Sequence, residues 1–259
     1  MYRQKEIAVV IPALNEEQSV GSVVSALKTL TDDLGTGPLI DDIVVCDNGS
    51  TDSTARVASA AGARVVEELE PGYGVACLTG ISALKDSDVV VFVDADNSVV
   101  VDEARTLIRQ VLDGSDLVVG SRSLGNLAPG AMTIQQRFGN WLASLLIHRL
   151  WRYPITDLGP FRAISFKALE QLDMQDRTFG WTVEMQVKAI QRRMNVTEIP
   201  VSTKKRIGRS KISGTLSGTI GAAMGIFGMI FKLYLQQKRE GKKQTPNRSL
   251  SKKQASQSN

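Results

Sequence analysis

Apolar runs alternate with amphipathic segments through the first half of the chain. The runs are short, rich in β-branched residues and not interrupted by polar positions, which is typical of strands buried on both faces of a parallel sheet. The segments between them carry apolar residues at helical spacing. Strands are therefore predicted over residues 7–11, 42–47, 63–67 and 89–93. Helices are predicted over residues 19–30, 54–61 and 75–84.

The second half continues the same alternation. Strands are predicted over residues 117–122, 157–164 and 196–201. Helices are predicted over residues 102–112, 136–151, 166–172 and 181–193. Because strands and helices alternate along the chain, we expect an α/β fold with a Rossmann-like, mostly parallel sheet. Helices should cover both faces of this sheet.

Carboxylates follow several of the predicted strands. Asp94 and Asp96 come directly after the strand at 89–93, Asp47 ends the strand at 42–47, and Glu16 follows the first strand. Ligands of open α/β sheets bind at the carboxyl ends of the strands, so these side chains should share one cleft. Two neighbouring carboxylates favour a hard cation such as Mg²⁺ or Mn²⁺. The alternative is that Asp94 and Asp96 cap the next helix or form a turn.

Charged residues of the second half add further candidates. Arg122 ends a predicted strand, and Asp157 and Arg162 flank a turn before another. Glu184 lies in the first turn of a predicted helix, where it either faces the cleft or interacts with the helix dipole. The basic loop 204–211 is either a clamp on phosphates or a solvated charged run.

Composition and charge narrow the class of protein. The chain has 259 residues, 42% hydrophobic and 22% charged, which is ordinary for a soluble globular protein. Its net charge of +4 gathers at 204–211 and after Gln237, which favours phosphates or a membrane surface as partners. The usual nucleic-acid motifs are absent, so no nucleic-acid partner is expected. The missing Gly-x-Gly-x-x-Gly and Walker A motifs argue against NAD enzymes and P-loop ATPases.

The N-terminus enters a strand without the apolar segment of a signal peptide. We therefore expect a cytoplasmic protein, with the inner face of the membrane as its place of action.

The segment 213–236 is apolar and carries one charged residue, Lys232. A membrane-spanning helix, an interfacial helix and a helix packed on the domain or on a second subunit all fit this pattern. We favour contact with a membrane surface or a subunit, the latter implying a homo-oligomer. The basic tail 237–259 has almost no apolar residues and is predicted to be disordered.

An ordered set of motifs covers about residues 5–212 of a predicted domain that spans 1–212. Together the motifs resemble family 2 glycosyltransferases with a GT-A fold, and among them the polyprenyl (dolichyl) phosphate hexose synthases. The matching pieces are Val10-Ile11-Pro12-Ala13-Leu14-Asn15-Glu16, Val45-Cys46-Asp47-Asn48-Gly49-Ser50-Thr51-Asp52, Asp94-Ala95-Asp96, Gly120-Ser121-Arg122, residues 157–162, Glu184 and Gly208-Arg209-Ser210-Lys211.

The resemblance implies a role for each group of residues. The base and ribose of a UDP- or GDP-linked sugar would be held by Pro12, Ala13, Glu16 and Asp47. The ribose, the diphosphate and a divalent metal, Mg²⁺ or Mn²⁺, would be held by Asp94, Ala95 and Asp96. Phosphates of the donor or acceptor would be held by Arg122, Arg162, Arg209 and Lys211.

The catalytic residues expected from the resemblance are Asp96 and Arg122, at the departing diphosphate. A hydroxyl acceptor would also need a general base, for which Asp157 and Glu184 are the candidates. Three positions depart from the polyprenyl-phosphate relatives. Ser98 replaces a glutamine that is a metal ligand, Tyr73 replaces the lysine of a Gly-Lys-Gly turn, and the turn 159–162 reads Gly-Pro-Phe-Arg.

The expected function is inverting, metal-dependent transfer of a hexose from a nucleoside diphosphate to a polyprenyl phosphate. A soluble hydroxyl acceptor is the alternative within the same class. A non-catalytic nucleotide-sugar-binding protein is the alternative outside it. A sugar nucleotidyltransferase is disfavoured because the first strand ends in Pro-Ala-Leu-Asn-Glu and not in a glycine-rich loop.

Overall fold

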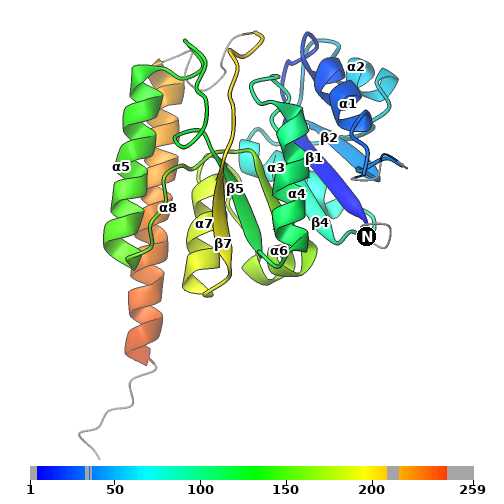
Figure 1. Ribbon diagram of the computed structural model, residues 1–259. Helices are drawn as coiled ribbons and strands as arrows, with labels where there is room; N and C mark the ends of the chain where they lie inside the picture. Colours follow the sequence, from blue (N-terminus) through cyan, green and yellow to red (C-terminus); the bar gives the residue numbers. More distant parts are fainter. Residues whose placement is uncertain (1–4, 33–34, 36, 209–215, 244–259) are drawn as a thin grey trace, which may run out of the picture.

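The computed structural model describes residues 5–32, 35, 37–208 and 216–243 (Figure 1). Within these residues seven strands form one sheet in the order β3-β2-β1-β4-β6-β5-β7. Strand β6 is antiparallel to both of its neighbours, and the other pairs are parallel. The strands are β1 (Ile7–Ala13), β2 (Asp42–Asp47), β3 (Arg64–Glu67), β4 (Val89–Phe92), β5 (Leu117–Ser121), β6 (Arg162–Ser165) and β7 (Val196–Pro200).

Helices cover both faces of the sheet, as the sequence predicts. Helices α1, α2 and α4 pack on one face, and α3, α6 and α7 on the other. The α/β fold with a mostly parallel sheet is therefore confirmed. The helices are α1 (Val20–Lys28), α2 (Thr54–Ala60), α3 (Tyr73–Ser82), the 3₁₀ turn η1 (Val101–Glu103), α4 (Ala104–Leu112), α5 (Ile134–Trp151), α6 (Phe166–Leu172), α7 (Trp181–Gln191) and α8 (Leu216–Lys243).

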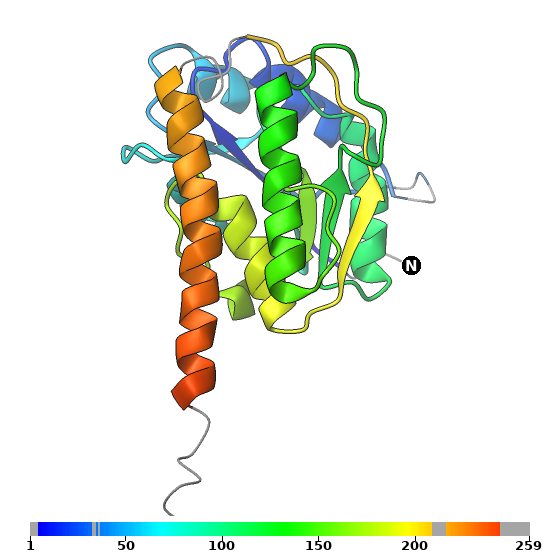
Figure 2. The same cartoon turned by 90° about the vertical axis from the view of Figure 1, so that its left-hand side faces the viewer.

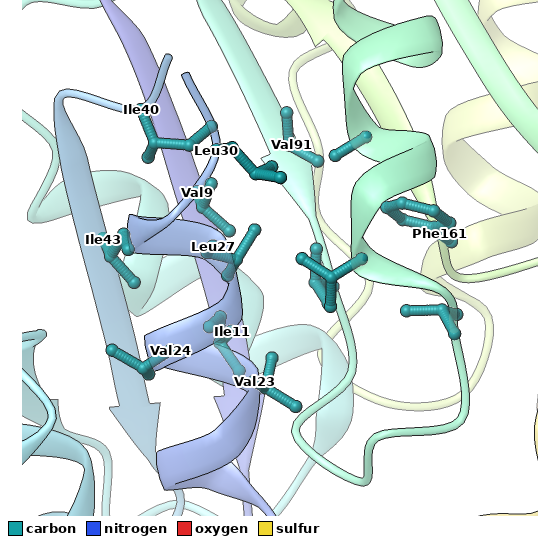
Figure 3. Packing of buried hydrophobic residues seen from close by; sticks show 14 of the residues in the cluster. Val9, Ile11, Val23, Val24, Leu27, Leu30, Ile40, Ile43, Val91 and Phe161 are labelled. Carbon is teal, nitrogen blue, oxygen red and sulfur yellow. The ribbon is translucent and has the colours of Figure 1, made fainter. Parts of the chain in front are cut away.

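The central strands are apolar at every position because both of their faces are buried. Val9 and Ile11 of β1 belong to the cluster that packs against Val23 and Leu27 of α1 (Figure 3). Val10, between them in the sequence, belongs to the cluster on the opposite face. Successive side chains of a strand point to opposite faces, so an unbroken apolar run fills both clusters.

Helices α5 and α8 lie side by side in a further layer outside α7 (Figure 2). Their buried side chains form a third apolar cluster with α7, whose members include Ala143, Ile147, Val183, Val187, Met229, Ile230 and Leu233. Gln136 and Thr133 form a capping box, which starts α5 at Ile134, two residues before the predicted start. Phe138 and Leu145 of this helix are exposed.

Helix α8 ends later than the sequence pattern indicates. It runs to Lys243 and so includes residues 237–243 of the predicted disordered tail. Contacts with α5 support this extension, since Trp151 Nε1 donates to Gln237 Oε1 (2.6 Å) and the Trp151 ring meets Tyr234 edge to face. The predicted boundary at 212–213 and residues 244–259 lie outside the described residues. No helix in the described part of the chain has the length and apolar character that crossing a membrane requires.

The start of α3 makes close contact with the segment before α7. The backbone N–H of Gly74 donates to Thr178 O (3.1 Å), and that of Val75 donates to Arg177 O (3.0 Å). A Cβ atom on Gly74 would lie 2.1 Å from the carbonyl oxygen of Asp176. Glycine is therefore required at position 74 because two backbone segments touch there.

Replacing Gly74 by alanine should lower the free energy of unfolding by about 1–3 kcal/mol, because the backbone of 176–178 must move. Urea unfolding of the purified variant measures this change. Gly139→Ala in α5 is the control, since its Cβ would meet no heavy atom within 4 Å. The control should be neutral or slightly more stable. Equal stability of the two variants would contradict the close packing at Gly74.

Candidate active site

A cavity of about 470 Å³ lies at the carboxyl ends of β1 and β4. It brings together six of the residues predicted to bind a nucleotide sugar, Pro12, Ala13, Glu16, Asp94, Ala95 and Asp96. The rest of its lining includes Asn48, Gly72, Tyr73, Thr178, Phe179 and Arg206. Parallel strands end at the same edge of the sheet, which explains why segments distant in sequence share one cavity.

Asp94 and Asp96 lie in this cavity with different partners. Asp96 is 6% exposed. Its Oδ1 accepts the backbone N–H of Ser98 (2.9 Å) and its Oδ2 accepts Nη2 of Arg206 (2.7 Å). Asp94 Oδ1 accepts the hydroxyl of Tyr73 (3.1 Å). Asp96 therefore stabilises a turn with one oxygen, as the alternative interpretation of the pair suggests, and binds a cation with the other.

The electrostatics of the pair follow from burial. Desolvation, followed by the negative charge of Asp96, raises the pKa of Asp94 to about 7. Burial, followed by the charge of Asp94, raises the pKa of Tyr73 well above its ordinary value, so its hydroxyl remains a donor. The two carboxylates thus form a site that gains free energy when a cation joins them.

The carboxylates of Asp94 and Asp96 fit a divalent cation that also binds a substrate. Among the described residues, no group of three or more His, Cys, Asp and Glu side chains forms a metal cage. Two carboxylates leave most of an octahedral shell for water and phosphate oxygens, the arrangement in which proteins commonly bind Mg²⁺ with a nucleotide. The guanidinium of Arg206 already places a positive charge at Asp96.

Asp47 lies beside the cavity and is not among the residues that line it. It pairs with Ala13 in the sheet register, and its Oδ1 accepts the backbone N–H of Ser50 (3.2 Å). Asn48 belongs to the same sequence motif and was not predicted as a site residue, but it does line the cavity. Its side chain donates to Glu68 O and accepts the N–H of Gly72 (2.9 Å), holding the loop before α3.

Asp157 is fully buried and bound by Arg122. Its Oδ2 accepts the backbone N–H (2.7 Å) and Nε (2.8 Å) of Arg122, and its Oδ1 accepts Nη2 (2.6 Å). Burial by itself lowers the pKa of Arg122. The hydrogen bonds and charge of Asp157, together with the charge of Asp94, outweigh this effect, so the pKa of Arg122 is raised. Asp157 therefore holds the guanidinium of Arg122, and its predicted role as a general base stays a prediction.

Arg162, which was predicted to contact phosphate, is not among the residues that line this cavity. It is fully buried, and its guanidinium donates to the carbonyl oxygens of Gly159 and of Thr182 (3.0 Å). Burial lowers its pKa to about 10. Its donors are taken by backbone carbonyls, so it links the turn before β6 to the start of α7.

Glu184 likewise is not among the residues that line the cavity. It is 2% exposed, and its carboxylate accepts the backbone N–H groups of Gln175 and Asp176 (2.7 Å) and the amine of Lys188 (2.7 Å). These contacts fix the segment that leads to Phe179 in the cavity wall. The predicted role of Glu184 as a general base stays a prediction, and in this structure its oxygens have backbone and lysine partners.

The predicted phosphate ligands Arg209 and Lys211 lie outside the described residues. Arg206, from the same basic loop, reaches the cavity. The sequence marks this loop as basic but does not indicate which of its cations turns inward. Tyr73 gives a weak signal, as an aromatic residue between two glycines where a lysine is common.

A second cavity, of about 650 Å³, is lined by Arg122 and by residues of α5. Apolar atoms make up most of its lining surface, and its apolar side chains are Leu127, Met132, Trp141, Leu145 and Ile155. Arg137 and His148 of α5 also line it. Arg122 thus lines this apolar cavity, and the charge of Asp94 helps to raise its pKa.

Comparison with known protein families identifies the chain. The family described as Glycosyl transferase family 2 matches residues 8–173. The protein belongs to glycosyl transferase family 2. An uncharacterized glycosyltransferase of Mycobacterium tuberculosis is 35% identical over 86% of this chain and 97% of that protein. A dolichyl-phosphate hexose transferase of Haloferax volcanii is 31% identical over 86% of this chain and 92% of that protein.

A solved structure supports the GT-A fold of this glycosyltransferase. Glucosyl-3-phosphoglycerate synthase of Mycobacterium tuberculosis, in complex with Mn²⁺, UDP and glucosyl-3-phosphoglycerate, matches with a TM-score of 0.70 at 23% identity. The match covers 90% of this chain and 81% of that protein. Fold and membership of the glycosyltransferase family, both predicted from the sequence, are thus confirmed.

The raised pKa of Asp94 gives the glycosyltransferase a testable pH dependence. Folded Asp94 binds a proton up to about pH 7, whereas unfolded Asp94 loses it near its ordinary value of 3.8. Between these limits the folded state binds more protons, so its stability should fall as pH rises, by up to about 1.4 kcal/mol per pH unit.

Urea unfolding of metal-free protein at several pH values between 4.5 and 7.5 measures this effect. Asp94→Asn is the control because its side chain has nearly the same shape and does not titrate. The difference in unfolding free energy between wild type and Asp94→Asn should decrease as pH rises. A difference that stays constant with pH would show that Asp94 titrates normally.

Proposed function

We propose that this glycosyltransferase transfers a hexose from a nucleoside diphosphate to a polyprenyl phosphate at an anionic membrane surface, with Mg²⁺ or Mn²⁺ as cofactor. The observation that carries the proposal is the apolar cavity of about 650 Å³, which is lined by Arg122. The charge of Asp94, in the cavity that contains both aspartates (the aspartate cavity), acts on Arg122. A lipid phosphate needs a cation beside an apolar channel, and this arrangement supplies both.

The aspartate cavity is the donor site in this proposal. Asp94 and Asp96 hold the metal, and Pro12, Ala13 and Glu16 contact the nucleoside. When bound, the metal supplies positive charge that stabilises the departing nucleoside diphosphate. The Mn²⁺ and UDP bound to the mycobacterial synthase of the same fold support a uridine nucleotide as donor.

The acceptor site needs a cation more than it needs a base. A phosphate is already an anion at neutral pH, so its attack on the sugar requires no proton removal. This fits the structure, in which both candidate bases, Asp157 and Glu184, are bound to other groups. Arg122 is held rigidly by Asp157, and a fixed guanidinium suits the binding of a phosphate.

The outer side of α5 and α8 supports contact with a membrane. Four apolar side chains of α5 are exposed, namely Ile134 (82%), Phe138 (60%), Trp141 (57%) and Leu145 (39%). Those exposed on α8 are Ile220, Met224, Phe231 and Leu235. Both helices bury their opposite sides in the apolar cluster that they share with α7. We call these eight residues the outer apolar face.

Basic residues accompany the outer apolar face. Arg137 and Arg149 of α5, and Lys232 and Lys238 of α8, are exposed. In the sequences of the two helices Glu240 is the single acidic residue. An apolar face with cations is the pattern of an interfacial helix on anionic lipid. The apolar cavity is lined by Trp141 and Leu145 of the same face, so a lipid could enter it from the membrane.

A small phosphorylated acceptor is the second candidate. The relative of the same fold was solved with glucosyl-3-phosphoglycerate, whose acceptor portion is a soluble phosphate. Arg122 would bind such an anion as well as a lipid phosphate. The apolar lining of the cavity favours the lipid.

An acceptor panel tests the proposal. Purified protein receives Mn²⁺, radiolabelled UDP- or GDP-hexose, and either polyprenyl phosphate in anionic vesicles or 3-phosphoglycerate. We expect label in the lipid fraction with one donor, and loss of at least about 100-fold in Asp96→Asn, which removes a metal ligand. Transfer to 3-phosphoglycerate alone would support the second candidate. Metal-dependent nucleotide binding without transfer to either would indicate a non-catalytic binder.

Removing apolar side chains from the outer apolar face should weaken membrane binding. Ile134→Ser with Phe138→Ser is the test variant, because neither residue lines the apolar cavity. Each side chain contributes about 1.5–3 kcal/mol if it is fully buried in lipid, so vesicle affinity should fall at least about tenfold. Co-sedimentation with phosphatidylglycerol vesicles measures the affinity.

The matched control is Leu69→Ser, which removes a side chain that is 75% exposed on another part of the surface. It should bind vesicles like the wild type. Unchanged binding of the double variant would contradict the membrane contact. If the wild type forms a dimer in solution that the double variant loses, the outer apolar face binds a second copy instead.

A further inference from the structure

Arg206 occupies the position at which the proposed metal site needs a positive charge. Its Nη2 lies 2.7 Å from Oδ2 of Asp96 and 3.7 Å from Oε1 of Glu16. The other oxygen of Asp96 accepts the backbone N–H of Ser98. Both oxygens of Asp96 therefore have partners, and a metal ion would have to compete with the guanidinium for Oδ2.

The backbone holds Arg206 in this place. The N–H of Ile207 donates to the carbonyl of Asp96 (3.0 Å), and that of Lys204 donates to the carbonyl of Ser98 (2.7 Å). The loop thus lies along the segment that follows β4. Because these bonds use backbone atoms only, the Arg206 side chain can change partners while the loop keeps its position.

One donor of Arg206 has no partner. Its Nε–H is buried and makes no hydrogen bond in the described structure. A buried donor without a partner costs free energy, and an anion in the cavity would satisfy it. The side chain lines the same cavity as Asp94 and Asp96, where a diphosphate would accompany the metal.

We propose that Arg206 is a replaceable cation: it pairs with Asp96 in the metal-free protein and moves to the diphosphate of the donor when a divalent metal binds. This inference rests on the proposed donor site. Its consequence is cooperativity. A metal that binds alone must displace the Arg206 guanidinium from Asp96, and the guanidinium then loses its anionic partner. A metal that binds with a nucleoside diphosphate brings a new anionic partner for the guanidinium, so its binding costs less free energy.

Arg206 therefore has opposite effects on the two ligands. It weakens the binding of metal alone, because two cations compete for Asp96. It strengthens the binding of the nucleoside diphosphate once the metal is present. Each ligand should raise the affinity of the other by the same factor, as linkage requires, and Arg206 should account for much of that factor.

Isothermal titration with Mn²⁺ and UDP tests the proposal without any acceptor or turnover. GDP replaces UDP if the acceptor panel identifies a guanosine donor. The dissociation constant for Mn²⁺ is measured with and without saturating nucleotide, in the wild type and in Arg206→Ala. In the variant we expect Mn²⁺ alone to bind about three- to tenfold more tightly, and the nucleotide with Mn²⁺ to bind at least about tenfold more weakly.

Lys205→Ala is the matched control. It removes the same charge from the adjacent position, where the side chain is exposed and does not line the cavity. It should leave both constants within about twofold of the wild type. A similar change in both variants would mean that the general charge of the loop is responsible, and would overturn the specific role of Arg206.

Two further variants keep the outcome interpretable. Arg206→Gln retains length and polarity without charge and should behave like Arg206→Ala, which guards against an effect of lost packing. Asp96→Asn should lose Mn²⁺ binding. If Asp96→Asn still binds Mn²⁺ as the wild type does, the proposed donor site fails. If only the Arg206 variants leave Mn²⁺ affinity unchanged, the replaceable cation alone is wrong.

Discussion

The compensation of buried negative charge at the edge of the sheet organises this protein. Asp94 and Asp96 follow a strand that is buried on both faces, so their carboxylates lie where solvation is weak. Tyr73 and Arg206 come from two distant segments to meet them. A site that demands positive charge in this way is suited to a metal and to the diphosphate that it brings.

Arg122, which is partly buried, and Arg162, which is fully buried, have different surroundings although both are arginines at strand ends. Arg122 keeps its guanidinium between Asp157 and the apolar cavity, so it can meet a ligand. Arg162, fully buried, gives its donors to backbone carbonyls and supports the turn from which β6 begins. Both follow or begin a strand and both are cations in family motifs. The two differ in their acceptors: backbone carbonyls surround Arg162, whereas Arg122 is paired with one carboxylate and lines a cavity.

The outer pair of helices extends the catalytic domain toward its proposed acceptor. α5 and α8 bury one side on α7 and leave the other apolar and exposed. An apolar surface of this extent is expected to have a partner. The apolar cavity shares Trp141 and Leu145 with that surface, which would let one helix serve both membrane contact and acceptor binding.

The sequence by itself determined the layers of the fold and the edge at which the candidate site lies. Apolar runs of β-branched residues predict buried parallel strands, and the residues that follow such strands must meet at one edge. Glu16 and the pair of aspartates were found in this way, whereas Pro12 and Ala13 were expected from the family resemblance. The helix ends differ from the predicted ones where a capping residue sets them. The capping box at Thr133, for example, starts α5 earlier than predicted.

Only the tertiary structure decided which charged side chains face the cavity. Glu184 and Asp157 carry the right chemistry for a base, but backbone donors and Arg122 take up their oxygens. Arg206 is one of several cations in its loop, and its selection depends on backbone bonds to the segment after β4. Hydrogen-bond partners distant in sequence settle such questions, and no local pattern of residues encodes them.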